Sequence, residues 1–354
     1  MRSFLWDGAS TGNIELVKYF LKNNTNINTV NSDSYTLLHV ATINGRFDLV
    51  KYLIENKADV NLPNNDKRTP LCEASLHGFF EIVKLLVENK ADVNKADNDG
   101  VNPLFAAVYN GHLKIVQLLV NSGADVNFSD GDGVTPVHTA ASKGYSQIVK
   151  FLAKSKCDVN VPNRIGDAPL HVAAYRGHLD VVKCLTDKKN INLTNHDGFS
   201  AVSLAAQSGH LDVVEFLTEK GAKINGDDSA LFAAAQHGYL DIVKYLYSLE
   251  ADVNSRDAND YTPVYMASYF GHLPVVKFLT THQANINLAN KTGFTPLYAA
   301  SANGHLNIVK FLIKKGASVN IADKDGYTPL LMAADKGHFA VVKYLVKNKA
   351  NMNA

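Results

Sequence analysis

The residues best able to do chemistry in this sequence are thirteen histidines, which could hold a metal ion or exchange protons near neutral pH. The zinc motif HExxH, the nucleophile turn GxSxG, the fingerprint GxGxxG and the P-loop are all absent. The acidic pair Asp227 and Asp228 has no basic or aromatic cleft around it. We interpret this pair as a solvated turn and not as an acid–base pair. Six of the histidines directly follow a glycine, at His112, His178, His210, His272, His305 and His338.

Cysteine usage and the termini bear on the compartment. Cys72, Cys157 and Cys184 are scattered, odd in number and without a CxxC pair, which favours buried thiols in a reducing compartment. No apolar run approaches the ~18 residues of a membrane span, and the N-terminus lacks the pattern of a secretory signal. We therefore predict a cytoplasmic protein without membrane insertion, with the nucleus as the other open compartment.

Charge gives no sign of a nucleic-acid partner. Lys and Arg number 35 and Asp and Glu number 34, so no net field attracts nucleic acid or an anionic membrane. A lysine follows the valine in many amphipathic segments, as at Lys51, Lys84 and Lys310, but acidic residues are interspersed with this column. We interpret the column as a solvated face and predict no nucleic-acid binding.

The elements that position these side chains repeat along the chain. A glycine that ends a short run of small residues and precedes a longer amphipathic run recurs throughout. The intervals between successive glycines are 33 residues, apart from one of 32 before Gly209 and one of 29 after it. Such a period predicts an array of two-helix units. The recurring glycines are Gly12, Gly45, Gly78, Gly111, Gly144, Gly177, Gly209, Gly238, Gly271, Gly304 and Gly337.

Several tracts within this period resemble the ankyrin-repeat family. They are Thr295-Pro296-Leu297, Thr135-Pro136-Val137-His138 and Pro169-Leu170-His171-Val172-Ala173-Ala174, together with the Asp-Val-Asn tracts that end at Asn61, Asn94, Asn127, Asn160 and Asn254. The resemblance covers essentially the whole chain. It implies an all-α ankyrin-repeat solenoid of stacked helix-turn-helix units with projecting β-hairpin loops. We expect one domain over residues 1–354 with eleven repeats: a capping repeat (1–30), repeats 2–7 (31–225), and repeats 8–11 (226–354) after a shortened hairpin.

The resemblance also gives the histidines a structural role. His39, His138 and His171 occupy the family's Thr-Pro-Leu-His position, and the six histidines after the glycines start the second helices. Neighbours in either set are roughly 10 Å apart, too far to share a metal ion whose ligand bonds are near 2 Å. The four remaining histidines do not cluster, so we predict no metal site, no cofactor and no enzymatic activity.

Several positions depart from the repeated pattern. The residue before Pro169 is Ala168, where other units have a helix-capping side chain. The two short intervals predict a seam around residues 186–230. The apolar flank Val341–Val346 of the last unit should stay uncovered, so we expect either a longer natural chain or another surface on that end. Residues with a side chain replace the second C-cap glycine at Lys57, Lys90, Lys156, Lys189, Glu250, Gln283 and Lys349, and left-handed strain is expected there.

Binding should use the positions that vary between repeats. The resemblance implies a scaffold that binds a protein or peptide partner through the concave groove of hairpins and inner helices. We expect a monomer, unless the C-terminal end of the stack self-associates. Aromatic residues exposed together are typical binding hot spots, whereas packing of the same rings on their neighbours is the alternative. The predicted groove residues are Leu76, His77, Tyr109, Arg164, Tyr175, Arg176, Tyr261, Tyr269, Phe270, Phe294 and Tyr327.

Three other possibilities stay open. Arg164, Tyr175 and Arg176 could hold an acidic or phosphorylated segment. The chain could also be the ankyrin segment of a larger channel, ubiquitin-ligase adaptor or secreted effector. A leucine lies eight residues before a repeat asparagine in many units, which resembles the substrate pattern of asparaginyl hydroxylases. The candidate hydroxylation sites are Asn61, Asn94, Asn127, Asn160, Asn225 and Asn254.

Overall fold

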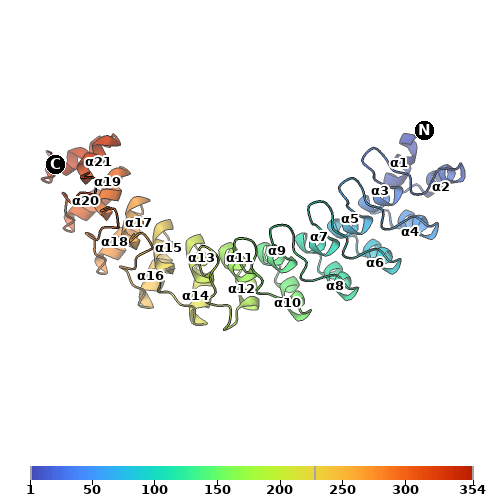
Figure 1. Ribbon diagram of the computed structural model, residues 1–354, viewed down its shortest axis with the longest axis horizontal. Helices are drawn as coiled ribbons and strands as arrows, with labels where there is room; N and C mark the ends of the chain where they lie inside the picture. The colour runs from blue at the N-terminus through green and yellow to red at the C-terminus, as the bar shows by residue number, and fades with distance from the viewer. Residues whose placement is uncertain (1, 227–228, 353–354) are drawn as a thin grey trace. The chain divides into compact units, whose positions relative to one another are not determined.

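The predicted two-helix unit is confirmed by a computed structural model that describes residues 2–226 and 229–352. These residues form 22 helices and no strand (Figure 1). The projecting loops contain only two isolated antiparallel bridges in the described ranges, Val30 with Thr36 and Thr194 with Ser200. The chain divides into two compact units, Met1–Pro169 and Leu170–Ala354, and each is described by itself.

The first helix of each repeat is the inner helix, and inner helices of successive repeats pack on one another within each unit. They are α1 (Arg2–Thr11), α3 (Leu37–Ile43), α5 (Pro70–His77), α7 (Pro103–Tyr109), α9 (Pro136–Lys143), α11 (Pro169–Arg176), α13 (Ala201–Ser208), α15 (Ala230–His237), α17 (Pro263–Tyr269), α19 (Pro296–Ala302) and α21 (Pro329–Asp335).

The second helix of each repeat is the outer helix, and these form a second layer behind the first. They are α2 (Ile14–Lys22), α4 (Phe47–Glu55), α6 (Phe80–Glu88), α8 (Leu113–Asn121), α10 (Ser146–Lys154), α12 (Leu179–Leu185), α14 (Leu211–Glu219), α16 (Leu240–Ser248), α18 (Leu273–Thr281), α20 (Leu306–Lys314) and α22 (Phe339–Lys347).

Local sequence explains where each inner helix begins and ends. At α19 the Thr295 hydroxyl accepts a hydrogen bond from the Tyr298 amide at 3.2 Å. Pro296 then occupies the first helical turn, where its missing N–H costs nothing. Gly304 follows the helix with φ +72°, a left-handed conformation that glycine adopts without strain. The same arrangement of cap, proline and glycine bounds α5, α7, α9, α17 and α21.

The core lies between the two helix layers. In α20, Ile308, Val309 and Leu312 are 0–1% exposed. The equivalent apolar residues of the outer helices from α4 to α18 are buried as well, for example Val276 and Leu279 in α18. Because each repeat buries its apolar face against the next one, the core within each unit is continuous from repeat to repeat and has no single centre.

Two columns of side chains join successive repeats within each unit. Asn94 donates to the Gly123 carbonyl at 3.2 Å and accepts from the Asp125 amide at 2.8 Å. On the other side of the helices, His305 Nε2 donates to the Tyr269 carbonyl at 2.9 Å. Its ring covers Gly271 so closely that a Cβ there would lie 2.8 Å from the imidazole. These histidines are therefore structural hydrogen-bond donors.

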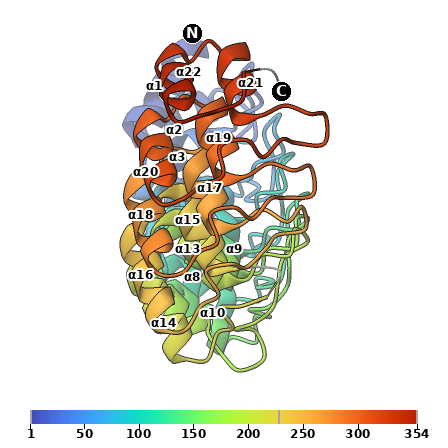
Figure 2. The same cartoon turned by 90° about the vertical axis from the view of Figure 1, so that its left-hand side faces the viewer.

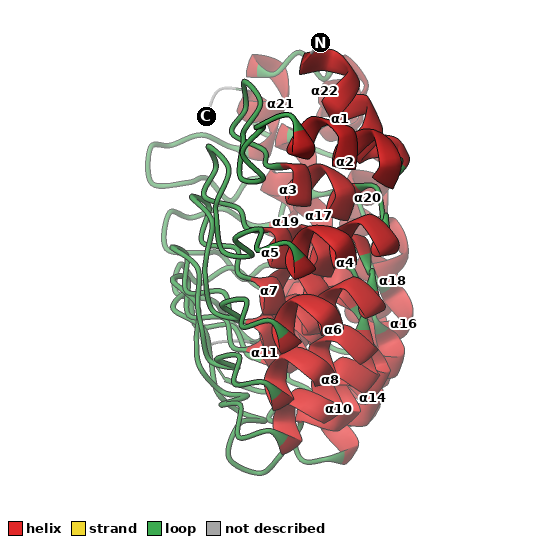
Figure 3. Ribbon diagram, turned by 90° about the vertical axis from the view of Figure 1, so that its right-hand side faces the viewer, coloured by secondary structure: helices red, strands yellow, loops and turns green. Residues whose placement is uncertain are grey.

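Within each unit, the hairpin loops, green in Figure 3, project to one side of the helices. In the tenth repeat, the Asn290 side chain accepts from the amides of Thr292 (3.0 Å) and Phe294 (2.8 Å), which closes the turn. At the tip of this hairpin, the Lys291 amide donates a hydrogen bond to the Asn259 carbonyl of the preceding hairpin at 3.2 Å. Side-chain caps and tip-to-tip bonds therefore hold the hairpins without a strand ladder.

The expected left-handed residues are confirmed with one exception. Lys57, Lys90, Lys156, Glu250, Gln283 and Lys349 all have φ between 62° and 71°. The prediction for Lys189 was wrong, because this loop is one residue shorter and follows a different path. Helix α12 ends at Leu185, and the buried Asn190 side chain donates to the Leu185 carbonyl at 2.7 Å. An asparagine cap thus replaces the left-handed residue.

The other departures are located as follows. Asp227 and Asp228 of the shortened hairpin lie outside the described residues, so the solvated turn and the hinge of the seam stay predictions. In the last repeat, Val341 and Leu345 are buried, while Val346 is 39% exposed. The expected uncovered flank is thus limited to part of α22.

Candidate functional site

The predicted groove residues lie at two places in each repeat, the hairpin and the C-terminal end of the inner helix. Figure 2 shows the hairpins of α17, α19 and α21 beside their inner helices. Tyr269 and Phe270, at the end of α17, are 42% and 47% exposed. Tyr327, in the hairpin before α21, is 46% exposed. These three rings are the exposed members of the C-terminal aromatic set.

A ladder of aromatic rings runs through the ninth repeat. The Tyr261 ring lies 4.7 Å from the ring of Tyr265, measured between centroids. Tyr265 stacks on Tyr269 at 6.3 Å, and Tyr269 meets the Phe270 ring edge-on at 5.0 Å. Tyr265 is buried, and burial raises the pKa of its hydroxyl. Tyr261 is half-buried against this ring, so its packing supports the position of Tyr269.

The tenth repeat uses its hairpin ring in the same way. Phe294 stacks on Tyr298 with centroids 4.5 Å apart. The Tyr298 hydroxyl donates to the Asp323 carboxylate of the next hairpin at 3.0 Å. Burial and this carboxylate raise the pKa of Tyr298. Phe294 is half-buried. Tyr261 and Phe294 therefore pack on neighbouring rings, which was the alternative to exposed binding residues.

The three residues predicted for an acidic segment fall in different units. Arg164 belongs to the first unit, where its guanidinium pairs with the exposed Asp132 at 3.1 Å and donates to the Gly131 carbonyl at 2.9 Å. Tyr175 and Arg176 belong to the second unit, at the end of α11. Arg164 is thus already paired within its own unit.

Tyr175 and Arg176 border a hollow of about 440 Å³ at the ends of three inner helices, α11, α13 and α15. These helices follow one another in Figure 1. We call it the Arg176 hollow, and its lining residues are Tyr175, Arg176, Gln207, Ser208, His210, His237 and Tyr239. Of these residues, the sequence pattern predicted only Tyr175 and Arg176. Tyr239 could have been noticed, because it replaces the histidine that usually follows the glycine.

The first unit holds the remaining groove residues. The Lys143 ammonium lies 4.1 Å from the ring centroid of Tyr109, which is 51% exposed. Leu76 is half-buried. His77 Nε2 lies 3.9 Å from the Glu73 carboxylate. These residues belong to successive inner helices but form no common cavity among the described pockets.

A buried charge network in the third repeat was missed by sequence reasoning. Glu73 is only 3% exposed, and burial raises its pKa. Arg68 lies 3.8 Å from this carboxylate and donates two hydrogen bonds to the buried Asp97, at 3.0 and 3.2 Å. The sequence does contain a signal for this network, because Glu73 is an acid at the position where the neighbouring repeats have Val40 and Ala106.

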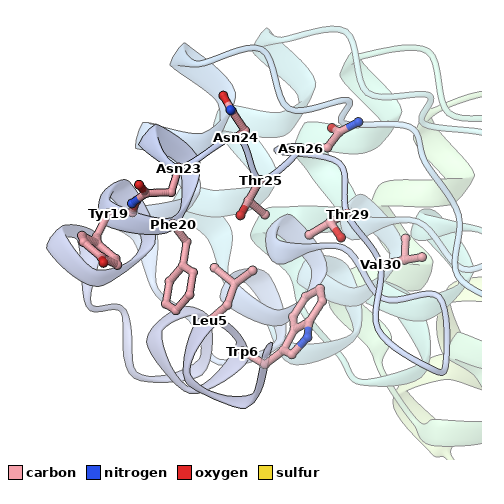
Figure 4. Close-up of a pocket in the computed structure, with 10 residues that line it drawn as sticks. All are labelled: Leu5, Trp6, Tyr19, Phe20, Asn23, Asn24, Thr25, Asn26, Thr29 and Val30. Carbon is pink, nitrogen blue, oxygen red and sulfur yellow. The ribbon is translucent and has the colours of Figure 1, made fainter. Parts of the chain in front are cut away.

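A hollow of about 580 Å³ in the first repeat was not predicted. Figure 4 shows the rings of Trp6 and Phe20 near Leu5, with Asn24 and Asn26 on the adjoining loop. Phe20 corresponds to Leu312, which is fully buried between repeats. Among the described residues no repeat packs on this side of α2, which explains why the hollow is open.

The candidate hydroxylation sites have structural roles. Five of the six (Asn61, Asn94, Asn127, Asn225 and Asn254) accept a hydrogen bond from an amide of the next repeat, at 2.7–3.1 Å. Asn160 also has a partner in the structure. Their hydroxylation stays a prediction.

The described residues contain no group of three or more His, Cys, Asp or Glu side chains that could hold a metal ion. Across the same residues, every helix is too short or too polar to cross a membrane.

Comparison with known families follows the repeats along the chain. A family model described as ankyrin repeats (3 copies) matches residues 5–97, 92–163, 155–228 and 264–354. A second model, described as ankyrin repeats (many copies), matches residues 231–280. A comparison with curated proteins gives no match.

Proposed function

Since this chain belongs to the ankyrin-repeat family, whose repeats are a general protein–protein interaction module, we propose that it is a non-enzymatic scaffold. It binds a protein or peptide partner through the hairpin and inner-helix surface of its second unit. The polar residues that recur at the repeat period are used to hold the stack together. This structural role agrees with a scaffold that binds a partner through its other residues. His305 and Asn254, for example, bond to neighbouring repeats.

The observation that carries the proposal is the exposure of Tyr269 and Phe270. Two adjacent aromatic rings at 42% and 47% exposure leave apolar surface in water. Tyr265, which itself packs on Tyr261, stacks on the Tyr269 ring, so Tyr269 is held in place before a partner arrives. Rigid aromatic side chains lose little conformational freedom on binding, which makes them effective anchors.

The test is a double substitution, Tyr269→Ala with Phe270→Ala, in the whole chain. We expect affinity for the captured partner to fall about tenfold or more, because a hot-spot side chain contributes about 2 kcal/mol. The free energy of unfolding should change by about 1 kcal/mol, the value of one exposed aromatic pair. Quantitative affinity capture and thermal unfolding measure the two effects.

Phe339→Ala is the matched control, because Phe339 is an exposed aromatic residue of the same unit, on outer helix α22. It should leave partner binding unchanged. A large loss of stability in the Tyr269/Phe270 variant, with binding intact, would show that these rings serve packing and would contradict the proposal.

A further inference from the structure

The Arg176 hollow differs from the aromatic surface of the ninth repeat in the chemistry of its walls. It lies wholly within the second unit, and its residues come from three successive repeats. Tyr175 is 46% exposed, and Tyr239 is 37% exposed. The walls also carry the guanidinium of Arg176, the amide of Gln207 and the hydroxyl of Ser208, which are all hydrogen-bond donors.

The donors of this hollow are free within the described structure. Arg176 has no ion-pair partner among the described residues, and its guanidinium carbon lies 5.9 Å from the Tyr175 ring centroid. Neither Gln207 nor Ser208 forms a side-chain hydrogen bond to any described residue. By contrast, Arg256 of the same unit lies 3.6 Å from the Asp260 carboxylate. The Arg176 guanidinium is thus available to a ligand, whereas the Arg256 guanidinium already has a carboxylate partner.

The walls of the hollow carry no negative charge. His210 Nε2 donates to the Tyr175 carbonyl at 3.1 Å, which pairs an exposed oxygen at the end of α11. No carboxylate lines the hollow. The nearest acids along the chain, Asp180, Asp212 and Asp241, lie in the first turns of α12, α14 and α16, and none of them is a lining residue. The balance of charge at the walls is therefore positive.

We infer that the Arg176 hollow receives a carboxylate side chain from an acidic segment of the protein partner. The carboxylate pairs with the Arg176 guanidinium, and the Gln207 amide and Ser208 hydroxyl donate to its oxygens. The rings of Tyr175 and Tyr239 pack against the aliphatic part of the same side chain. This inference rests on the proposed scaffold function and specifies one part of its partner.

A carboxylate fits this site better than a phosphate because the hollow has one permanent positive charge. Burial, followed by the charge of the neighbouring His272, lowers the pKa of His237, which leaves that imidazole neutral at neutral pH. A doubly charged phosphate is normally held by several cationic groups. One guanidinium with two neutral donors matches the single charge and two oxygens of a carboxylate.

The experiment uses the full chain and fluorescent peptides of one scaffold sequence. The test peptide carries glutamates, and the comparison peptides carry glutamines, lysines or phosphoserines at the same positions. Fluorescence anisotropy at low and physiological salt gives the affinities. We expect the glutamate peptide to bind, and we expect the glutamine and lysine peptides to bind at least about tenfold more weakly. Salt should reduce the affinity of the glutamate peptide.

Substitutions then assign the binding to this hollow. Arg176→Gln should weaken glutamate-peptide binding about tenfold, because the ion pair is lost. Arg176→Lys should restore part of it, since the charge remains but the planar fork does not. Arg256→Gln is the matched control and should bind as the wild type, because this arginine lies outside the hollow.

Three results would overturn the inference: equal binding by Arg176→Gln and wild type, equal binding of glutamate and glutamine peptides, or tighter binding of the phosphoserine peptide. If any of these occurs while Tyr269→Ala with Phe270→Ala still abolishes partner capture, the scaffold function stands without this site. If the double variant also keeps its partner, the proposed function itself fails.

Discussion

Histidine shows how position decides the role of a residue in this chain. The buried His39 accepts a hydrogen bond at Nδ1 from the Thr36 amide (3.2 Å), while its Nε2 donates to the Arg68 carbonyl of the next hairpin at 3.1 Å. His138 makes the equivalent Nε2 bond to the Asp167 carbonyl at 2.9 Å. Both nitrogens are used within the stack, so these imidazoles have no free lone pair for a metal ion.

The burial of His39 predicts a pH dependence of stability. Burial lowers the pKa of His39 to about 4, whereas an unfolded histidine titrates near pH ~6.5. Between these values the unfolded state binds more protons, so the contribution is complete above pH ~6.5 and is lost as pH falls toward about 4. The full loss is roughly 3 kcal/mol, by the factor of ~1.36 kcal/mol per pKa unit.

Urea unfolding of the wild type and His39→Gln between about pH 7 and about pH 4.5 measures this contribution. We expect the variant to be less stable at neutral pH and to lose less stability on acidification. Parallel pH curves for the two proteins would show that His39 does not carry the effect.

At the scale of the helix, the ends of the outer helices are strained at most repeats. Lys90 follows α6 with φ 67°, a conformation that costs a residue with a side chain about 1 kcal/mol relative to glycine. Lys90→Gly should therefore raise the free energy of unfolding by about 1 kcal/mol. Chemical unfolding of the two proteins under identical conditions measures the difference.

The reverse substitution is available at the next repeat and serves as the matched control. Gly123 follows α8 with φ 92°, and no atom lies within 4 Å of the position a Cβ would take. Gly123→Lys should lower stability by about the same amount, through the backbone alone. If both substitutions shift stability in the same direction, left-handed strain is not the cause.

At the scale of the whole molecule, helices of each unit pack mainly on those of adjacent repeats. Damage should therefore stay local. Leu279 in α18 is fully buried, and Leu279→Ala should cost about 2–5 kcal/mol through the cavity it leaves. Hydrogen exchange should accelerate in α17 to α20 and stay unchanged in α3 to α6 of the first unit.

Thr281→Ala, at an exposed position of the same helix, is the control and should change exchange little. A uniform loss of protection across both units after Leu279→Ala would mean that the chain unfolds as one cooperative block, contrary to the expectation for a repeat array.

The sequence alone determined the features that depend on residues within one repeat. Thr295, Pro296 and Gly304 act through their own backbone conformation and nearest amides, so their roles could be predicted without a fold. The left-handed Lys90 followed from its place after an amphipathic run. The same logic failed at Lys189, where one missing residue allowed Asn190 to cap α12.

Only the tertiary structure decided the features that depend on what neighbouring repeats place against a side chain. The stack buries Glu73 beside Arg68, covers one side of Tyr261 with Tyr265, and leaves Tyr269 exposed. The Arg176 hollow likewise combines side chains that lie about one repeat apart in sequence, Arg176, Ser208 and His237. The spacing in the sequence sets the period at which such residues recur. Whether a side chain is buried, and whether its donors are paired, depends on contacts between repeats, which the sequence of a single repeat does not contain.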